Sequence, residues 1–142
     1  MSTEQTASGG CLCGAVQYTV GGPLRPVLYC HCDQCRKTSG HFVAATACDS
    51  ENLHVGVDNG LRWYRSSPMA ERGFCSSCGS SLFWRADGED YICIMAGTVD
   101  RPTNLQASGH IFVENASDYY RISDNLPQYE GADPKAWAIE GD

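Results

Sequence analysis

Seven of the nine cysteines gather into three short clusters, and these thiols are the side chains best suited to metal binding or catalysis. The first cluster is Cys11–Cys13, the second spans Cys30–Cys35, and the third is Cys75–Cys78. Two thiolates that lie two or three residues apart can reach one metal ion from a single tight turn. Structural zinc takes four ligands in a tetrahedron, so a complete site needs two such turns.

The residue that follows each cluster indicates which turns share a metal. Gly14 and Gly79 directly follow the first and third clusters, and glycine allows the positive φ that turns backbone N–H groups toward the sulfurs. The middle cluster is followed by Arg36 instead. We therefore predict one structural zinc site of four thiolates, whose loss would unfold or loosen the domain. Its ligands are predicted to be Cys11, Cys13, Cys75 and Cys78.

The middle cluster predicts a second zinc site, held by Cys30, Cys32 and Cys35. Three protein thiolates leave one coordination position open for water or substrate, which is typical of catalytic zinc. An added thiol would occupy that position as its thiolate, or a carbonyl would be polarised there. We thus expect two zinc ions per chain, the second being the more labile.

Two other interpretations of the middle cluster stay open. One is a second structural zinc site completed by His31 or a distant histidine, and the other is a redox relay without metal. His31 lies between two cysteines, so its ring is expected to point away from a metal that they share. His31, His41 and His110 are weaker candidates for lining a pocket at the open site. Cys48 and Cys93 lie in apolar runs and are expected to be small buried hydrophobes.

Six basic side chains near these clusters or in the middle of the chain could receive a carboxylate-bearing substrate. The sequence alone favours a solvated surface position for each of them. They are Arg36, Lys37, Arg62, Arg65, Arg72 and Arg85.

Short β-type runs separated by turn signals must position the clusters. Single strands are predicted at Ala15–Val20, Val27–Cys30, Phe42–Cys48, His110–Val113 and Tyr119–Ile122. Hairpins are predicted for Leu53–Val57 with Leu61–Arg65 around Asn59-Gly60, and for Leu82–Arg85 with Tyr91–Met95 around Asp87-Gly88. The one expected helix begins with Asp33 as its cap, runs through Lys37 and stops at Ser39-Gly40.

These elements predict an all-β fold: an open barrel or sandwich of short antiparallel strands, stapled by zinc, with one short helix after the three-cysteine cluster. Residues 1–8 are expected to form a flexible lead, residues 9–130 the zinc-binding β domain, and residues 131–142 a C-terminal tail. We see no repeat or low-complexity tract in the chain.

Composition narrows the possible partners. The chain has 142 residues with 17 acidic and 10 basic side chains, for a formal charge of −7, which argues against a nucleic acid held through its phosphates. No apolar run approaches the roughly 20 residues that span a bilayer, so no membrane partner is expected. Met1–Gly10 has no secretory signal pattern, and together with the odd cysteine count this favours a cytoplasmic protein with metal-binding thiols over a disulfide framework.

The clusters and their order resemble the glutathione-dependent formaldehyde-activating enzyme family, which includes centromere-protein-V-like domains. The matching segments are Gly9–Val20, Cys30–Gly40, Cys75–Trp84, His110–Tyr120 and Asp124–Gly131. The resemblance implies a tent-like all-β zinc fold, with the structural zinc at the four-thiolate site and a second zinc at Cys30, Cys32 and Cys35 in the active site. The founding activity of that family joins formaldehyde to glutathione, giving S-hydroxymethylglutathione, and the family is classed with the carbon–sulfur lyases.

We therefore expect a zinc-dependent enzyme that makes or breaks a carbon–sulfur bond, acting on a small thiol such as glutathione and an aldehyde adduct. Cys30, Cys32 and Cys35 would be the catalytic set, and zinc, His31 or His41 would stabilise the oxygen of the adduct. Two alternatives are a non-catalytic zinc-binding interaction module and a zinc or redox sensor. The sequence gives no indication of oligomeric state.

Overall fold

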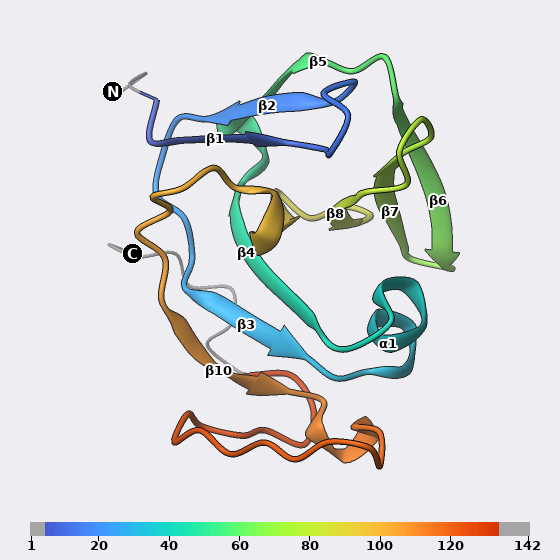
Figure 1. Ribbon diagram of the computed structural model, residues 1–142, viewed down its shortest axis with the longest axis vertical. Helices are drawn as coiled ribbons and strands as arrows, with labels where there is room; N and C mark the ends of the chain where they lie inside the picture. The colour runs from blue at the N-terminus through green and yellow to red at the C-terminus, as the bar shows by residue number, and fades with distance from the viewer. Residues whose placement is uncertain (1–4, 134–142) are drawn as a thin grey trace.

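Strands dominate the fold, which the computed structural model describes for residues 5–133. They form two sheets that do not close into a barrel (Figure 1). The smaller sheet has the order β1–β2–β5, with strands at Ala7–Gly10, Gln17–Val20 and Leu53–Val57. The larger sheet has the order β10–β3–β4–β9–β8–β7–β6, in which β10 and β3 are parallel and the other pairs antiparallel. Its strands are β3 (Val27–Cys30), β4 (Val43–Asp49), β6 (Leu61–Ser67), β7 (Ala70–Cys75), β8 (Ser81–Ala86), β9 (Tyr91–Met95) and β10 (Ala107–Ile111).

One α-helix occurs in residues 5–133, and it follows β3 as predicted: α1 (Asp33–Ser39). Its N-cap is Cys32, whose sulfur accepts a hydrogen bond from the N–H of Cys35. The prediction that Asp33 caps the helix is therefore wrong by one residue, because a thiol takes the role expected of the carboxylate. The helix ends at Gly40, whose φ of 91° suits glycine. Three short 3₁₀ turns complete the elements: η1 (Ser50–Asn52), η2 (Ala96–Thr98) and η3 (Val113–Asn115).

The main core lies between the two sheets. Val16, Tyr18 and Val20 from the β2 segment pack against Phe83 and Ile94 of the large sheet, all of them buried. The rings of Tyr18 and Phe83 meet edge to face with centroids 5.5 Å apart. The predicted all-β class with one short helix is thus confirmed, and its apolar alternation explains which strand faces meet.

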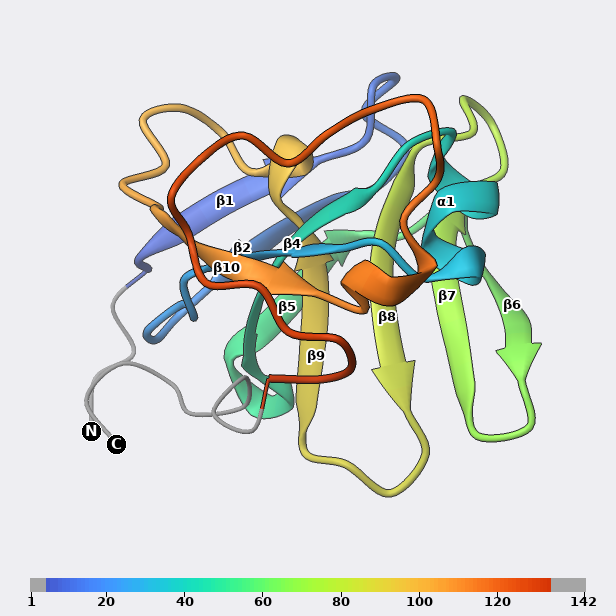
Figure 2. The same ribbon diagram turned by 90° about the horizontal axis from the view of Figure 1, so that it is seen from below.

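A second apolar cluster lies on the other face of the large sheet. Ala45, Ala47 and Cys93 are buried there beside Cys35 of α1. Figure 2 shows α1 beside the β6–β7 end of this sheet. The three-cysteine segment is therefore packed on the face of the large sheet that the small sheet leaves uncovered.

The predicted hairpin around Asn59-Gly60 is wrong, although both of its strands exist. β5 pairs with β2 in the small sheet, whereas β6 pairs with β7 in the large one. The turn is tied to other turns instead: the N–H of Gly60 donates to the carbonyl of Ala15, and its carbonyl accepts from the N–H of Ser76. Gly60 does not take the positive φ that a two-residue Asn-Gly hairpin requires. The second predicted hairpin is confirmed, since β8 and β9 pair antiparallel and Gly88 has a φ of 77°.

Two further expectations change at the ends of the chain. Ala7 and Ser8, placed in the flexible lead by the sequence, form the first half of β1. Tyr119–Ile122 is not a strand, since its backbone joins neither sheet; the hydroxyls of Tyr119 and Tyr120 hydrogen-bond to His41 and His31. Most of the expected C-terminal tail, residues 134–142, lies outside the described residues, as do residues 1–4. Within residues 5–133, no helix has the length and apolar character needed to cross a membrane.

Candidate functional site

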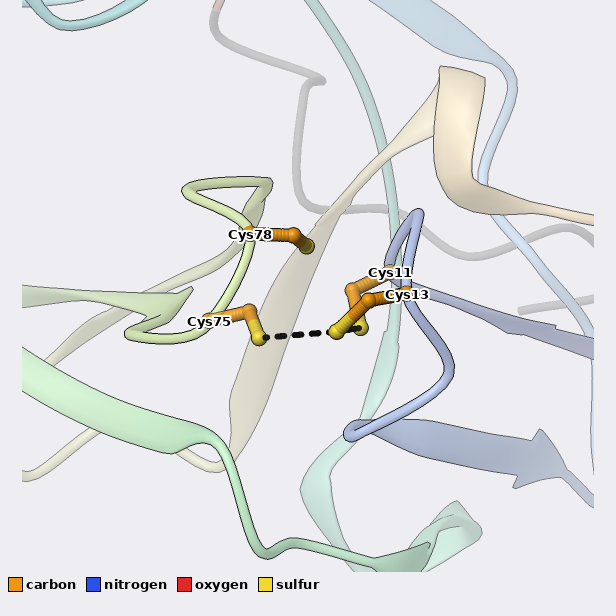
Figure 3. Close-up of side chains that lie close together, drawn as sticks. All are labelled: Cys11, Cys13, Cys75 and Cys78. Carbon is orange, nitrogen blue, oxygen red and sulfur yellow. Dashed lines mark hydrogen bonds between the residues drawn. The ribbon is translucent and has the colours of Figure 1, made fainter.

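The two outer cysteine clusters come together, as the sequence predicted, from turns in different sheets. Cys11 and Cys13 lie in the turn between β1 and β2, and Cys75 and Cys78 lie at the turn between β7 and β8 (Figure 3). The sulfur of Cys13 is 3.8 Å from that of Cys11 and 3.8 Å from that of Cys75. All four sulfurs lie within 4.8 Å of one another.

These distances fit a tetrahedral metal. Zinc–sulfur bonds of about 2.3 Å at tetrahedral angles place neighbouring sulfurs about 3.8 Å apart. Gly14 and Gly79 have φ values of 86° and 83°, the conformation expected of them beside the thiols. The N–H of Val16 points at the sulfur of Cys11 at 3.2 Å. The four residues are therefore arranged so that they could hold a metal ion, which would join the two sheets.

Hydrogen bonds favour the anionic form of one of these thiols. The hydroxyl and backbone N–H of Ser80 donate to the sulfur of Cys78 and lower its pKa to about 5. The same hydroxyl accepts from the N–H of Leu12 in the opposite turn, at 3.0 Å. Ser80 thus links the two turns around a thiol prepared for metal binding.

The middle cluster forms a second, separate group. Cys30 ends β3, Cys32 caps α1 and Cys35 lies in the first helical turn, with their three sulfurs within 4.8 Å of one another. The thiols of Cys30 and Cys35 donate to the sulfur of Cys32, and with backbone N–H groups they lower its pKa; the pKa of Cys30 is raised. One thiolate is therefore favoured within the group even without a cation.

A cavity of about 610 Å³ opens beside these three thiols. Its walls are mainly apolar, and its described lining includes two cations, Arg25 and Arg72. The apolar part of the lining includes Leu28, Val43, Ala45, Trp84, Met95 and Ile111. A small molecule bound in this cavity would be removed from solvent against the apolar walls, as in many ligand sites, and would contact the cysteine sulfurs at one end.

The predicted histidines lie elsewhere. His31 and His110 are buried behind β3, with His31 Nε2 2.9 Å from His110 Nδ1. His110 Nε2 lies 3.0 Å from a carboxylate oxygen of Asp124, and His31 Nδ1 bonds the hydroxyl of Tyr120. Burial lowers the pKa of His31 to about 4, and the nearby rings of His110 and His41 act in the same direction.

His31 and His110, which are hydrogen-bonded to each other, therefore connect strands and a loop. Neither of them lines the cavity. His41 likewise bonds the Tyr119 hydroxyl at 2.5 Å, away from the cavity lining. The ring of His31 contacts the rings of His110 and Tyr120, and His31 is not among the residues that line the cavity. The structure brings the predicted cysteines of each group together, whereas His31, His41 and His110 are not among the residues that line the cavity.

Apart from the three cysteines, the sequence interpretation did not single out the residues that line the cavity. Arg72 was only one of six basic candidates, because β7 was not predicted and nothing in its sequence indicated which of them would face the cavity. Cys93 is buried as expected but faces the cavity. Its apolar strand gave no signal for which face would carry the site.

Known proteins are similar to this chain in sequence. The family model described as glutathione-dependent formaldehyde-activating enzyme matches residues 6–115. A Halomonas elongata protein named as a glutathione-dependent formaldehyde-activating enzyme is 30% identical over 127 residues, covering 80% of this chain and 79% of its own. A Schizosaccharomyces pombe protein named as a lyase is 27% identical over 127 residues, covering 85% and 88% respectively.

The architecture also matches a solved structure. A crystal structure of a Rhodobacter sphaeroides protein aligns with a TM-score of 0.58, over 85% of this chain and 98% of that one. At 19% identity the match concerns the fold alone.

Proposed function

The chain belongs to the glutathione-dependent formaldehyde-activating enzyme family, and on that premise we propose that it makes or breaks a carbon–sulfur bond at the three-cysteine cluster. The substrates are a small thiol such as glutathione and an aldehyde such as formaldehyde. In the forward direction the thiol sulfur bonds to the aldehyde carbon, the C=O π pair moves to oxygen, and the thiol proton ends on that oxygen. The reverse reaction releases thiol and aldehyde from the adduct.

The observation that carries this proposal is a group of three thiols beside a cavity. The four-cysteine group supplies a full tetrahedral set, whereas Cys30, Cys32 and Cys35 supply one ligand fewer and line the cavity. Zinc held by these three would supply a Lewis acid with one open coordination position, which favours the thiolate form of a substrate thiol.

The chain's own groups prepare this end of the cavity for an anionic sulfur. The sulfur of Cys32 accepts from the N–H of Cys35 at the beginning of α1, where the helix N-terminus favours negative charge. Arg72 adds a positive charge close to Cys35, with Nη2 3.8 Å from its sulfur. Apolar side chains that include Trp84 and Ile111 line the same cavity.

The test is the variant Cys32→Ser. Serine retains an oxygen that accepts from the N–H of Cys35, so α1 keeps its cap while the cluster loses a thiol. We expect zinc content to fall from two ions per chain to one, the fold to persist, and the enzymatic rate to vanish. Because thiols add to formaldehyde spontaneously, the rate should be measured by NMR exchange and referred to the reaction without protein.

The matched control is Cys48→Ala, which removes one thiol from the core on the other face of the large sheet. It should retain two zinc ions and full rate enhancement. Unfolding of Cys32→Ser with loss of both ions would refute the division between the sites. Wild-type protein without rate enhancement would instead point to a non-catalytic zinc module, and loss of one zinc on mild oxidation without turnover would point to a sensor.

A further inference from the structure

The guanidinium group of Arg72 is half-buried and has few hydrogen-bond partners. Its two hydrogen bonds both start from Nη2 and are long, at 3.5 Å to Gln34 Oε1 and 3.8 Å to the sulfur of Cys35. Its Nε is buried and has no hydrogen-bond partner among residues 5–133. None of the carboxylates in that part of the chain forms an ion pair with it. A guanidinium with donors left over beside a cavity is a site for an anion.

The other basic side chains considered for substrate binding have partners or positions that exclude this role. Arg36, Arg65 and Arg85 form ion pairs of 2.8–3.0 Å with acidic residues. Arg62 is exposed on β6 and donates to main-chain carbonyls. Of the six candidates that the sequence offered, Arg72 is the one that lines the cavity.

The second cation of the cavity is already engaged. Arg25 is buried and donates to the carbonyls of Pro26 and Ala45, and thereby connects the β2–β3 segment to β4. The hydrogen bonds of Arg25 therefore stabilise the fold. The Nε of Arg72, in contrast, has no hydrogen-bond partner within residues 5–133.

We propose that Arg72 binds a carboxylate of the thiol substrate, so that the cavity selects thiols that also carry an acid group. The planar fork of guanidinium matches the two oxygens of a carboxylate, and the apolar walls around it strengthen the pairing. Its position near Cys35 places the acid group and the sulfur of one small molecule at the same end of the cavity. This inference rests on the proposed function, because that function places the sulfur of the substrate at the three-cysteine group. Its test does not require turnover.

The test measures binding of S-methylglutathione to the zinc-loaded protein by isothermal titration calorimetry. The methyl group removes the acidic S–H, so binding reports contacts other than thiolate coordination. Arg72→Gln should weaken binding about ten- to a hundredfold, the usual effect of losing hydrogen bonds to a charged group. The diethyl ester of the same probe, which has no carboxylate, should bind wild type and Arg72→Gln equally.

Two further variants make the result specific. Arg62→Gln removes the same charge from an exposed site on β6 and should leave binding of both probes unchanged. Arg72→Lys keeps a charge but loses the fork, so its loss for the acid probe should be smaller than that of Arg72→Gln. If Arg72→Gln does not fold, a selective loss for the acid probe in Arg72→Lys carries the test.

Three outcomes would overturn the proposal. Arg72→Gln could bind both probes as wild type does, or lose both equally. It could also lose its second zinc while acid-probe binding is unchanged, in which case Arg72 only balances the charge of the thiolates. Carboxylate-selective loss in a protein that shows no thiol–aldehyde turnover would support the anion site and reject the proposed function, so the two failures are distinguishable.

Discussion

The sulfur of Cys32 has both a structural role and a place in the candidate site. Its sulfur is a member of the three-thiol group and also the N-cap of α1. A cap is worth about 1 kcal/mol, because it satisfies a backbone N–H that the helix itself leaves unpaired. The geometry of the thiol group is therefore coupled to the start of the helix.

This coupling predicts a difference between two variants that both lose the second zinc. Cys32→Ala should be less stable than Cys32→Ser by about 1 kcal/mol, since only serine keeps an acceptor for the N–H of Cys35. Urea unfolding of both variants, each with its remaining zinc, measures the difference. Equal stabilities would show that the sulfur does not act as a cap.

Gly60 is a second residue whose role depends on what surrounds it. A Cβ at this position would lie 2.6 Å from the sulfur of Cys75 and 3.0 Å from the Cβ of Ala15. Glycine is therefore required for close approach of the β5–β6 turn to the four-thiol group, and not for a hairpin conformation.

We predict that Gly60→Ala lowers zinc affinity at the four-thiol site about tenfold or more, by displacing Cys75. Gly56→Ala in β5 is the control, because a Cβ there meets nothing within 4 Å. Competition with a chromophoric chelator measures both. A wild-type affinity in Gly60→Ala would mean that the turn can move away without cost to the metal site.

At the scale of elements, the sequence identified strands better than their partners. Apolar β-type runs bounded by turn signals located β4, β5 and β9 closely, because strands that bury their side chains are apolar and end where the chain turns. Partner choice is set by contacts between distant segments, so the local Asn59-Gly60 signal predicted a hairpin that the cysteine turns override. The polar strand β7 was missed for the same reason, since two neighbouring strands hold it in place.

The sequence also located both thiol groups while misplacing the histidines. Cysteine spacing is a local property, and the glycines after two clusters report the turn shape directly. The surroundings of His31 and His110 depend on β10 lying parallel to β3 and on a loop about ninety positions further along the chain from His31. No short pattern encodes such contacts, nor the approach of Arg72 to Cys35.

The loop that follows η3 is attached to β10 through Asp124. The carboxylate of Asp124 accepts from the N–H of Leu126 and pairs with His110, and both contacts lower its pKa. A carboxyl group with a lowered folded pKa stabilises the protein above its unfolded pKa, and the contribution is lost as the pH falls through the folded value.

Asp124→Asn should therefore lower the urea midpoint at pH 7 relative to wild type. The gap between the two proteins should shrink as the pH falls below the ordinary carboxyl value of 3.8. Paired urea titrations at pH 7, 4 and 3 test this. A gap that widens toward pH 3 would contradict the assigned direction of the pKa shift.

At the scale of the whole molecule, the two thiol groups have different relations to the chain. The four-thiol group joins turns more than sixty residues apart and connects the small sheet to the large one. The three-thiol group lies within six consecutive residues at the β3–α1 junction. One metal would thus restrain the tertiary structure, and the other only a local turn.

This difference predicts that a chelator removes the metals in two phases with different structural effects. The first zinc should leave the three-thiol group with little change in far-UV circular dichroism, because β3 and α1 remain packed in the sheet without it. The second should leave the four-thiol group together with the β-sheet signal, since the turns of Cys13 and Cys75 then lose the bond that joins the sheets. Cys32→Ser supplies the internal control: it should show the second phase alone, at the wild-type rate. Loss of the sheet signal during the first phase would mean that the three-thiol group, and not the four-thiol group, holds the two sheets together.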